Sequence, residues 1–600
     1  MTAAIHTFHI PVMGLGFTID SPAKVAQYGI SSVISLVDDG LIEKMRELYC
    51  RHQDKDFHPI SDKIDDFRAK RITAYLNLMD DVVREKFEAV RNSVRTNRAE
   101  MEKYLAMLPS QSEIRQKFHD LREEYGHGKA WEWVQEHISP GKIDVNIMTK
   151  VDKANYRGKE KLPNEYSDAH AALRGFAQSK LESSIVLSAG MNPRLYGYME
   201  NFEDFFPDES GHLKKKITLK VSDYRSALIQ GKFLAKKGLW VSEFRIESGL
   251  NCGGHAFATE GYLMGPILEE FSTKKDILKK MLFKTYRKGL EKNGYDIPEK
   301  PFDIQITAQG GVGTAEEHQF LQDHYDVDSV GWGSPFLLVP EAVSIDAETI
   351  RLLQNAEEDD LYLSGISPLG VPFNNVRGNT KDIEKMQWIA SDRAGSPCPK
   401  KYVQFDTEFT EKPICTASRQ YQYLKVQQLN EQDLDPVAYQ KAYDEIVEKA
   451  CICVGLGTSA LLSNDLDTTK EGGGVSVCPG PNMAYFSKEV SLDKMVDHIY
   501  GRDNVIQRQD RPQMFIKELS LYVNYLKDQI ADNPDPDDEK QQKYFSKFRE
   551  NLLAGIEYYR NLFSDLDVYF QSRKSELLEA LDRFEEELSL LVPEQGVLVN

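Results

Sequence analysis

The sequence has little positive charge, few cysteines and no long apolar run. Its 600 residues carry 74 Lys and Arg against 94 Asp and Glu, a net charge of −20, which argues against general nucleic-acid binding because that needs a basic face. No run of about 18 apolar residues occurs, so no membrane span is expected. Seven cysteines are too few for a disulfide framework and favour a reducing, cytoplasmic setting. The start, Met1 to His6, lacks the pattern of a signal peptide.

Other absences exclude common nucleotide-binding motifs. The Gly472-Gly473-Gly474 run lacks the Lys-Ser/Thr of a P-loop, so we interpret it as a loop. No dinucleotide fingerprint of the Rossmann type appears. No internal repeat is found. The length fits roughly two to four domains, or one large barrel with insertions.

What the sequence does contain is an alternation of strands and helices. Apolar segments predict strands at 6–17, 31–36, 142–148, 184–190, 217–221, 239–246, 304–313 and 327–334. Segments between them, such as 224–237 and 315–323, are typical of helices. This alternation implies a parallel sheet covered on both faces. Several strands end in glycines, which favours an α/β (β/α)₈ TIM barrel with its site at the carboxyl ends of the strands.

Two regions outside this alternation are predicted to be helical. Between 60 and 138, apolar residues such as Ile72, Tyr75 and Leu76 recur at helical spacing, which indicates a helical insertion after the second strand. From Arg511, two apolar stripes separated by a break at 533–537 indicate a helical hairpin or small bundle.

We therefore divide the chain into four parts, with loops expected at 359–377 and 470–487. The parts are the barrel (1–45 and 140–345), a helical insertion (46–139), a loop-rich, cysteine-containing extension (346–500) and a C-terminal helical hairpin or bundle (501–600).

Two neighbouring strands that end in glycine indicate a phosphate site. Gly310-Gly311 follows one strand and precedes a helix, where backbone N–H groups can hold a phosphate. The next strand ends at Gly331-Trp332-Gly333-Ser334, again with small residues. Adjacent glycine ends late in a barrel are the usual phosphate site of this fold. Flavin mononucleotide or a sugar phosphate would fit, and tight turns without a ligand are the alternative.

A third glycine turn carries a histidine. Gly249-Leu250-Asn251-Cys252-Gly253-Gly254-His255 follows the strand at 239–246. Paired glycines let the backbone approach a flat or phosphorylated ligand, and a histidine beside them can act as a base or donor. Read alone, the element is more often a turn with a packed or solvated histidine. Cys252 is either a reactive thiol near an imidazolium or, as is commoner, a small buried filler.

Five cysteines gather after the barrel. They are Cys398, Cys415, Cys451, Cys453 and Cys478. An iron–sulfur or zinc site with Cys398, Cys415, Cys451 and Cys453 as ligands is one interpretation. The spacing is poor for a metal, because Cys451-Ile452-Cys453 is not Cys-x-x-Cys, so ordinary buried thiols are the alternative.

In their order, these segments resemble the nitronate monooxygenase and FMN-dependent enoyl-ACP reductase family, once called 2-nitropropane dioxygenases. The family's Gly-x-Glu-Ala-Gly-Gly-His element corresponds to Gly249–His255, and its Ala-Ala-Gly-Gly-Ile turn to Ala308–Val312. Its Asp-Gly-Val-x-x-Gly-Thr-x-Phe-Leu-x-x-Pro-Glu element corresponds to Asp328–Glu341. Pro11–Gly14 resembles the first flavin-contacting loop, and Val145–Ile147 resembles the Gly-Val-Asn-Leu strand. The resemblance covers about 1–45 and 140–345.

The resemblance implies a barrel that carries FMN, and it assigns roles to particular residues. His255 would act as acid or base over the flavin, and Lys220 could face the flavin or the phosphate. The other implied cofactor residues are Gly310, Gly311, Gly333 and Ser334 at the phosphate, Met13, Gly14 and Asn146 near the isoalloxazine, and Gly253 and Gly254 before the histidine.

The implied function is an FMN-dependent oxidoreductase of the monooxygenase or enoyl reductase type, with NADH or NADPH as a candidate reductant. The substrate would be a small molecule or an acyl thioester. Asn251-Cys252 replaces Glu-Ala, Gln309 replaces a small residue, and Trp332 is expected to crowd the site, which leaves the substrate open. The alternative is a flavin-free or inactive barrel whose helical additions bind protein partners or a second copy of the chain.

Overall fold

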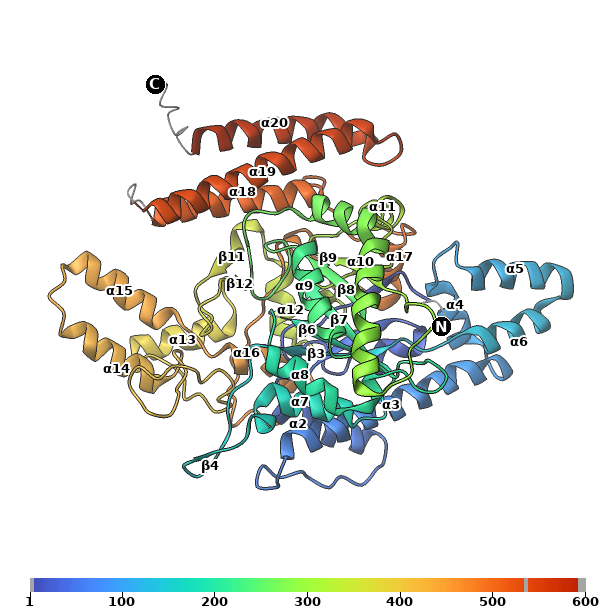
Figure 1. Cartoon of the computed structure of the whole chain (residues 1–600), viewed down its shortest axis with the longest axis horizontal. Coiled ribbons are helices and arrows are strands. Elements are labelled where there is room, and N and C mark those ends of the chain that lie inside the picture. Colours follow the sequence, from blue (N-terminus) through green and yellow to red (C-terminus); the bar gives the residue numbers. More distant parts are fainter. Residues whose placement is uncertain (1–4, 189, 534–537, 592–600) are drawn as a thin grey trace.

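A closed barrel of eight parallel strands forms the centre of the molecule (Figure 1). The computed structural model describes residues 5–188, 190–533 and 538–591. Around the barrel the strands follow the order β1-β10-β9-β8-β7-β6-β3-β2. They are β1 (Phe8–Ile10), β2 (Ser31–Ser35), β3 (Ile143–Met148), β6 (Ser183–Ser188), β7 (Lys215–Val221), β8 (Val241–Glu247), β9 (Gln305–Gln309) and β10 (Ser329–Gly331). The predicted TIM barrel is confirmed. Met1 to Ala4, Ala189 of the expected strand 184–190, and 534–537 of the expected break lie outside the described residues.

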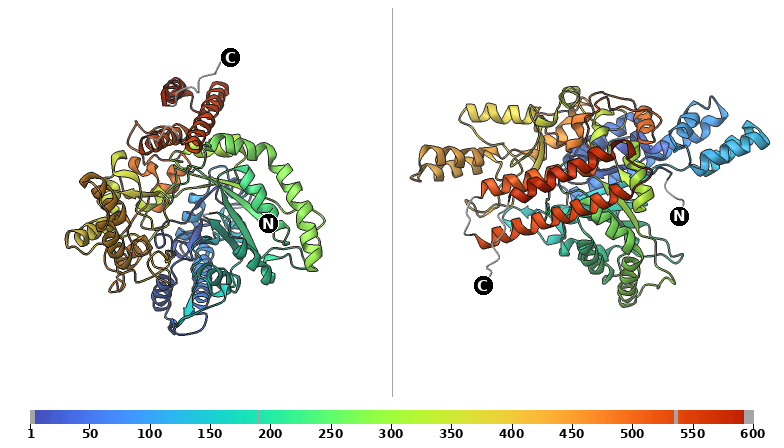
Figure 2. Two further views of the ribbon diagram at one scale, coloured as in Figure 1. Left: turned by 60° about the vertical axis from the view of Figure 1, so that its left-hand side comes forward. Right: turned by 90° about the horizontal axis from the view of Figure 1, so that it is seen from above.

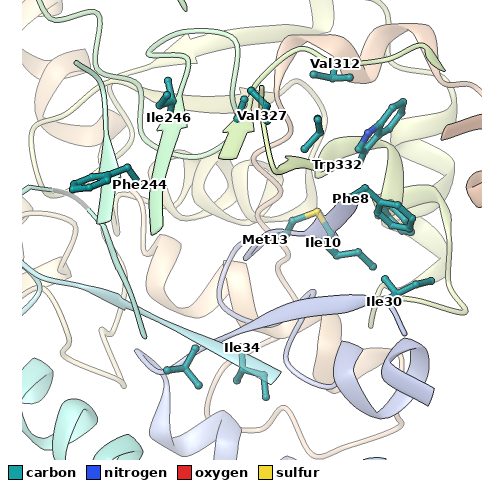
Figure 3. Packing of buried hydrophobic residues seen from close by; sticks show 14 of the residues in the cluster. Phe8, Ile10, Met13, Ile30, Ile34, Phe244, Ile246, Val312, Val327 and Trp332 are labelled. Carbon is teal, nitrogen blue, oxygen red and sulfur yellow. The ribbon is translucent and has the colours of Figure 1, made fainter. Parts of the chain in front are cut away.

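Strand β8 shows why these segments form the barrel wall. Phe244 points outward and packs against Phe271 of helix α10 (Met264–Asn293), with ring centroids 6.2 Å apart; Figure 3 shows part of this apolar packing. Its neighbour Glu243 points inward and accepts hydrogen bonds from Thr218 of β7 and Thr307 of β9. Because side chains alternate along a strand, one face of β8 serves the helix layer and the other lines the barrel interior.

The barrel interior holds charges that are paired. Arg245 binds Glu243 at 2.8 Å, and both side chains are buried. Burial alone would raise the pKa of Glu243, but Arg245, His9 and the hydrogen bond from Thr307 together outweigh burial and lower the pKa to about 2. The buried carboxylate is therefore ionised, and its hydrogen bonds to neighbouring strands fix the register of β7, β8 and β9.

The predicted helical insertion follows β2. It comprises α2 (Asp39–His52), α3 (Phe67–Asn92), α4 (Ala99–Met107), α5 (Glu113–Tyr125) and α6 (His127–His137). The apolar stripe of α3 is buried, and α3 packs on α2 and on α7 (Asp168–Ala177). Helices α5 and α6 pack on each other and project from the barrel (Figure 1).

The region after the barrel is more ordered than the sequence predicts. The segment 359–377, expected to be loop-rich, also contains two short strands, β11 (Leu361–Ser364) and β12 (Phe373–Val376), which pair as an antiparallel hairpin. The loop expected at 470–487 is confirmed except for a short 3₁₀ turn, Pro481–Tyr485. Helices also occur here: α12 (Ala347–Gln354), α13 (Thr380–Ala390), α14 (Arg419–Asn430), α15 (Pro436–Glu448), α16 (Ile452–Leu462) and α17 (Leu492–Ile499). Helices α13 to α15 project on the side opposite α5 and α6 (Figure 2).

The C-terminal helices form the expected small bundle. Helices α18 (Met514–Asp532), α19 (Glu539–Asp565) and α20 (Lys574–Leu591) pack on one another, and α19 contacts α10. They lie together over one end of the barrel helices (Figure 1). Within the described ranges, no helix combines the length and apolarity that crossing a membrane requires.

A buried carboxyl group joins this bundle to the barrel. Glu518 of α18 accepts hydrogen bonds from Ser248 Oγ at 2.5 Å, from the backbone N–H of Met264 at 2.9 Å, and from the Tyr559 hydroxyl at 3.4 Å. Burial raises the pKa of Glu518 from 4.5 to about 7. The carboxyl therefore holds its proton more tightly in the folded chain than in the unfolded chain.

This raised pKa predicts a pH-dependent stability. The contribution of Glu518 is fully present below pH 4.5 and is lost as pH rises through about 7, because the unfolded chain ionises first. Relative to Glu518→Gln, the wild type should lose about 2 kcal/mol of unfolding free energy between about pH 5.5 and about pH 8. Urea unfolding of both proteins at the two pH values measures the change. A difference between the proteins that is independent of pH contradicts the raised pKa.

Candidate cofactor site

A cavity of about 110 Å³ lies where the carboxyl ends of β1, β8, β9 and β10 meet. Each strand contributes the short segment that follows or ends it. These segments are Pro11–Gly14 after β1, Asn251–Gly254 after β8, Gln309–Val312 at the end of β9, and Gly333 to Pro335 after β10. The position is the one in which barrel enzymes place their sites.

The cavity brings together most of the residues predicted to bind the cofactor. Those that line it are Met13, Gly14, Gly253, Gly254, Gly310, Gly311, Gly333 and Ser334. Asn146 on β3, Lys220 on β7 and His255 beyond Gly254 are absent from its wall. The glycine turns therefore converge, while these three side chains lie apart from the cavity itself.

The turn after β9 can form only with glycine. Gly311 has a φ of +75°, and a Cβ atom there would lie 2.0 Å from Nδ2 of Asn251. In the described part of the chain, the backbone N–H groups of Gly311 and Val312 donate to no other protein group. N–H groups at the wall of a cavity, just before helix α11 (Ala315–Tyr325), are suited to bind an anion.

The turn after β10 presents Ser334 to the same cavity. Ser334 begins a short 3₁₀ turn, and its Oγ accepts a hydrogen bond of 2.8 Å from the backbone N–H of Gly480. Trp332 points elsewhere: it is buried, and its indole N–H donates to His318 at 3.2 Å. The expectation that Trp332 crowds the site is therefore wrong. Figure 3 shows Met13 beside Ile10, after the end of β1. A Cβ atom on Gly333 would lie 4.0 Å from the sulfur of Met13, so this side chain is close to the turn after β10.

A segment from the extension covers the cavity. This cover segment, Val477–Gly480, lines the cavity wall. The backbone N–H of Gly254 donates to the carbonyl of Cys478 at 3.1 Å. A Cβ atom on Gly253 would lie 2.4 Å from that same carbonyl oxygen, so the cover segment can sit this close only because Gly253 has no side chain. Nothing in the sequence pattern of 470–487 indicated this role.

Below the cavity lies a chain of polar side chains. Lys220 binds Glu247 at 2.6 Å, and Gln309 donates to the other oxygen of Glu247 at 2.7 Å. Glu247 and Gln309 both line the cavity. Sequence reasoning missed Glu247, although charged residues at every second position of β8 (Glu243, Arg245, Glu247) are a signal for an inward polar face.

Several buried polar atoms near this end of the barrel have no hydrogen-bond partner in the described structure. They include Asn146 Oδ1, Gln309 Oε1 and His9 Nε2. The last two flank Gly331, since a Cβ atom there would lie 3.0 Å from Gln309 Oε1 and 3.2 Å from His9 Nε2. Buried polar groups are normally paired, so these atoms indicate where a ligand could complete the site.

His255 is held by residues of the hairpin β11–β12 region. Its Nε2 lies 2.8 Å from Ser367 Oγ, and its ring packs edge-to-face on Phe373 with centroids 4.8 Å apart. Burial lowers the pKa of His255 to about 4. The imidazole is therefore neutral at pH 7, with one nitrogen fixed by Ser367 and the other free of partners among the described residues.

The cysteines behave as buried thiols. Cys398, Cys415, Cys451 and Cys453 share one buried cluster with Tyr402, and all are free. In the described ranges, no three His, Cys, Asp or Glu side chains form an arrangement that could hold a metal ion. Of the two interpretations offered for these four cysteines, the described structure fits ordinary buried thiols and gives no support to an iron–sulfur or zinc site.

Cys252 is also a thiol rather than a thiolate. Its Sγ lies 3.3 Å from the carbonyl oxygen of Gln309. Burial, together with the nearby Glu247, raises its pKa well above the ordinary value. Cys252 therefore fits the interpretation of a small filler beside the glycines.

Comparison with known proteins identifies similar solved structures. No protein-family model matches the sequence, and no curated protein matches it. FabK from Thermotoga maritima is 13% identical with a TM-score of 0.31, and the match covers 64% of this chain and 81% of that one. The enoyl reductase domain of MlnA from the macrolactin biosynthesis cluster of Bacillus amyloliquefaciens is 13% identical with a TM-score of 0.29, covering 75% and 88%.

A nitroalkane oxidase from Streptomyces ansochromogenes is 10% identical with a TM-score of 0.29, covering 63% of this chain and 84% of that one. The similar structures thus include an enoyl reductase domain and a nitroalkane oxidase.

The geometry of the β9 turn predicts that a single methyl group at position 311 strongly lowers the stability of the protein. Gly311→Ala would place a Cβ atom against Asn251 and impose a left-handed φ on alanine, so it should cost about 2 kcal/mol or more of unfolding free energy. The matched control is Gly473→Ala, since a Cβ atom there meets nothing within 4 Å. Thermal unfolding of both variants tests the difference. Equal melting temperatures would show that the turn relaxes at no cost.

Proposed function

We propose that the chain is an FMN-dependent oxidoreductase of the nitronate monooxygenase or enoyl reductase type. The observation that carries the proposal is the meeting of two glycine turns, Gly310-Gly311 and Gly333-Ser334, in one cavity at the carboxyl ends of adjacent barrel strands. Unpaired N–H groups of Gly311 and Val312 would take the phosphate of the cofactor.

The residues fit the phosphate end of FMN. A cavity of about 110 Å³ accommodates a phosphate group, whereas cofactor pockets span roughly 300–1,000 Å³. The whole cofactor would therefore extend beyond this cavity. The unpaired Asn146 and Gln309 oxygens and the Lys220–Glu247 pair would then offer polar partners to the ring system.

Bound FMN would supply the two-electron redox chemistry, with NADH or NADPH as the reductant in the reductase case. The protein's part is to bind, orient and move a proton. Lys220 and Glu247 would supply fixed charges at the cavity, whose wall includes Glu247. His255 would exchange one proton with a carbon acid or an acyl thioester through the ring nitrogen that Ser367 does not hold.

The proton chemistry proposed for His255 fits the proposed substrate class. A carbon acid such as a nitroalkane, or an enoyl thioester, needs one proton moved beside the carbon that exchanges electrons with the flavin, and a neutral imidazole can do this. Asn251-Cys252 brings no ionised group to the turn, since the Cys252 thiol holds its proton. We therefore assign the proton transfer to His255 rather than to the turn that precedes it.

Flavin binding is the first test. Wild-type protein should bind FMN in a one-to-one complex, seen as a flavin absorbance spectrum after dialysis and as quenched flavin fluorescence on titration. Gly311→Ala should weaken binding about tenfold or more, because it disturbs the turn that holds the phosphate, while Gly473→Ala should bind as the wild type does. Protein that is colourless and fails to bind added FMN is the flavin-free scaffold, and the proposal is then wrong.

The lowered pKa of His255 predicts the pH profile of turnover. Because the group stays neutral above about pH 4, kcat/KM should show no limb from His255 between about pH 5 and pH 8. His255→Ala should retain FMN and lose turnover by about 100-fold or more, the usual size of a proton-transfer contribution. Anaerobic reduction and oxidation of the flavin with candidate substrates gives both readouts. A fully active His255→Ala variant would remove the role assigned to this residue.

A further inference from the structure

We infer that Arg511, from the segment just before α18, is a positioning residue that aims the backbone N–H of Val312 at the cofactor phosphate. The inference rests on the proposed function and extends it, because it assigns part of the phosphate site to the C-terminal region. The feature that points to Arg511 is the number of groups it holds in and around the turn after β9.

Arg511 binds both the turn and the helix that follows it. Its Nη2 donates to the carbonyl of Gly311 at 2.7 Å, and its two terminal nitrogens bind the carboxylate of Glu317 at 2.9 Å each. Its Nε donates to Asn482 Oδ1 at 2.8 Å, and Asn482 Nδ2 in turn donates to the carbonyl of Val312 at 2.9 Å. Arg511 is 5% exposed and Glu317 is 2% exposed, so this network is shielded from water.

The guanidinium lies flat against the turn. A Cβ atom on Gly313 would be only 2.6 Å from Nη2 of Arg511, so the absence of a side chain at Gly313 lets the charged group approach the backbone. The other donors of the turn are already used: the N–H groups of Gly313 and Thr314 both donate to Glu317. In the described structure the N–H groups of Gly311 and Val312 donate to no protein group, and both residues line the cavity.

Because the peptide bond is planar, the contact between Arg511 and the Gly311 carbonyl sets the direction of the Val312 N–H. In a trans peptide, the carbonyl of one residue and the N–H of the next point in opposite directions, and no described peptide bond is cis. Arg511 fixes the carbonyl of Gly311 on its own side of the turn. The N–H of Val312 must therefore point to the opposite side, which is the side of the cavity.

Arg511 does not act by attracting the phosphate with its own charge, because that charge is paired within the protein. The Glu317 carboxylate neutralises Arg511 at 2.9 Å, and the guanidinium donates to groups of the protein itself. Arg511 therefore acts through the backbone turn, and its loss should affect only ligands that carry the phosphate.

The experiment compares FMN with riboflavin, which has the same ring and ribityl chain but no phosphate. Wild type, Arg511→Met and Arg511→Lys are titrated with both ligands, with quenching of flavin fluorescence as the readout. Arg511→Met should raise the Kd for FMN about tenfold or more, the expected effect of misplacing one charge-assisted hydrogen bond, and leave the Kd for riboflavin unchanged. Arg511→Lys, which keeps one donor, should lose less affinity for FMN and none for riboflavin.

The other outcomes overturn the inference in distinguishable ways. If both ligands weaken equally in Arg511→Met, the residue has a general structural role. If the wild type binds FMN and riboflavin equally well, the turn does not hold the phosphate. If the wild type binds neither, the proposed function itself is wrong. Should Arg511→Met fail to fold, Arg511→Lys decides, since an unchanged ratio of the two Kd values in that variant contradicts the positioning role.

Discussion

Backbone packed directly against backbone at the carboxyl end of the barrel is the constraint on which the rest of the structure depends. The cover segment reaches the β8 turn because Gly253 leaves room for the carbonyl of Cys478. On the other side, the N–H groups of Leu15 and Gly16 donate to the carbonyl of Leu456 in α16, and a Cβ atom on Gly16 would lie 3.0 Å from the Cα atom of Gly457. Barrel loops and extension are therefore joined through main-chain contacts that admit no side chain.

Such close contacts require a rigid barrel beneath them, and paired charges inside the barrel help to make it rigid. The interior of the barrel holds Glu243 and Arg245 without access to water, which is tolerable only because each ion has a partner and the remaining oxygens accept hydrogen bonds. The Lys220–Glu247 pair continues this arrangement toward the cavity. The same low-polarity surroundings keep His255 neutral and Cys252 protonated, so burial decides which groups near the site are available for proton transfer.

The parts of this architecture that follow local patterns could be predicted from the sequence. Apolar runs marked each barrel strand, helical spacing marked α3, and glycines after β9 and β10 marked the cavity. The residues that were missed make contacts over long separations. Ser367 lies 112 positions from His255, and Arg511 lies 200 positions from Gly311. Periodicity and turn chemistry describe neighbours in the chain, so they carry no information about such pairs. The β11–β12 hairpin was not predicted for a different reason. Its strands span only four residues each and show no clear alternation of apolar and polar residues.

These long-range contacts change how the helical additions should be regarded. If the bundle served only to bind a partner, it would not need buried contacts with the barrel. Yet Arg511 donates to the β9 turn, and Glu518 accepts a hydrogen bond from Ser248 of the barrel. If the barrel stood alone, Glu317 would lose the cation that pairs with it in a buried position, a change that is strongly destabilising for a buried ion pair. The barrel and its C-terminal region are therefore one folding unit around one cavity. Any ligand that binds this cavity stabilises both, because its binding free energy is added to a structure in which neither part is complete without the other.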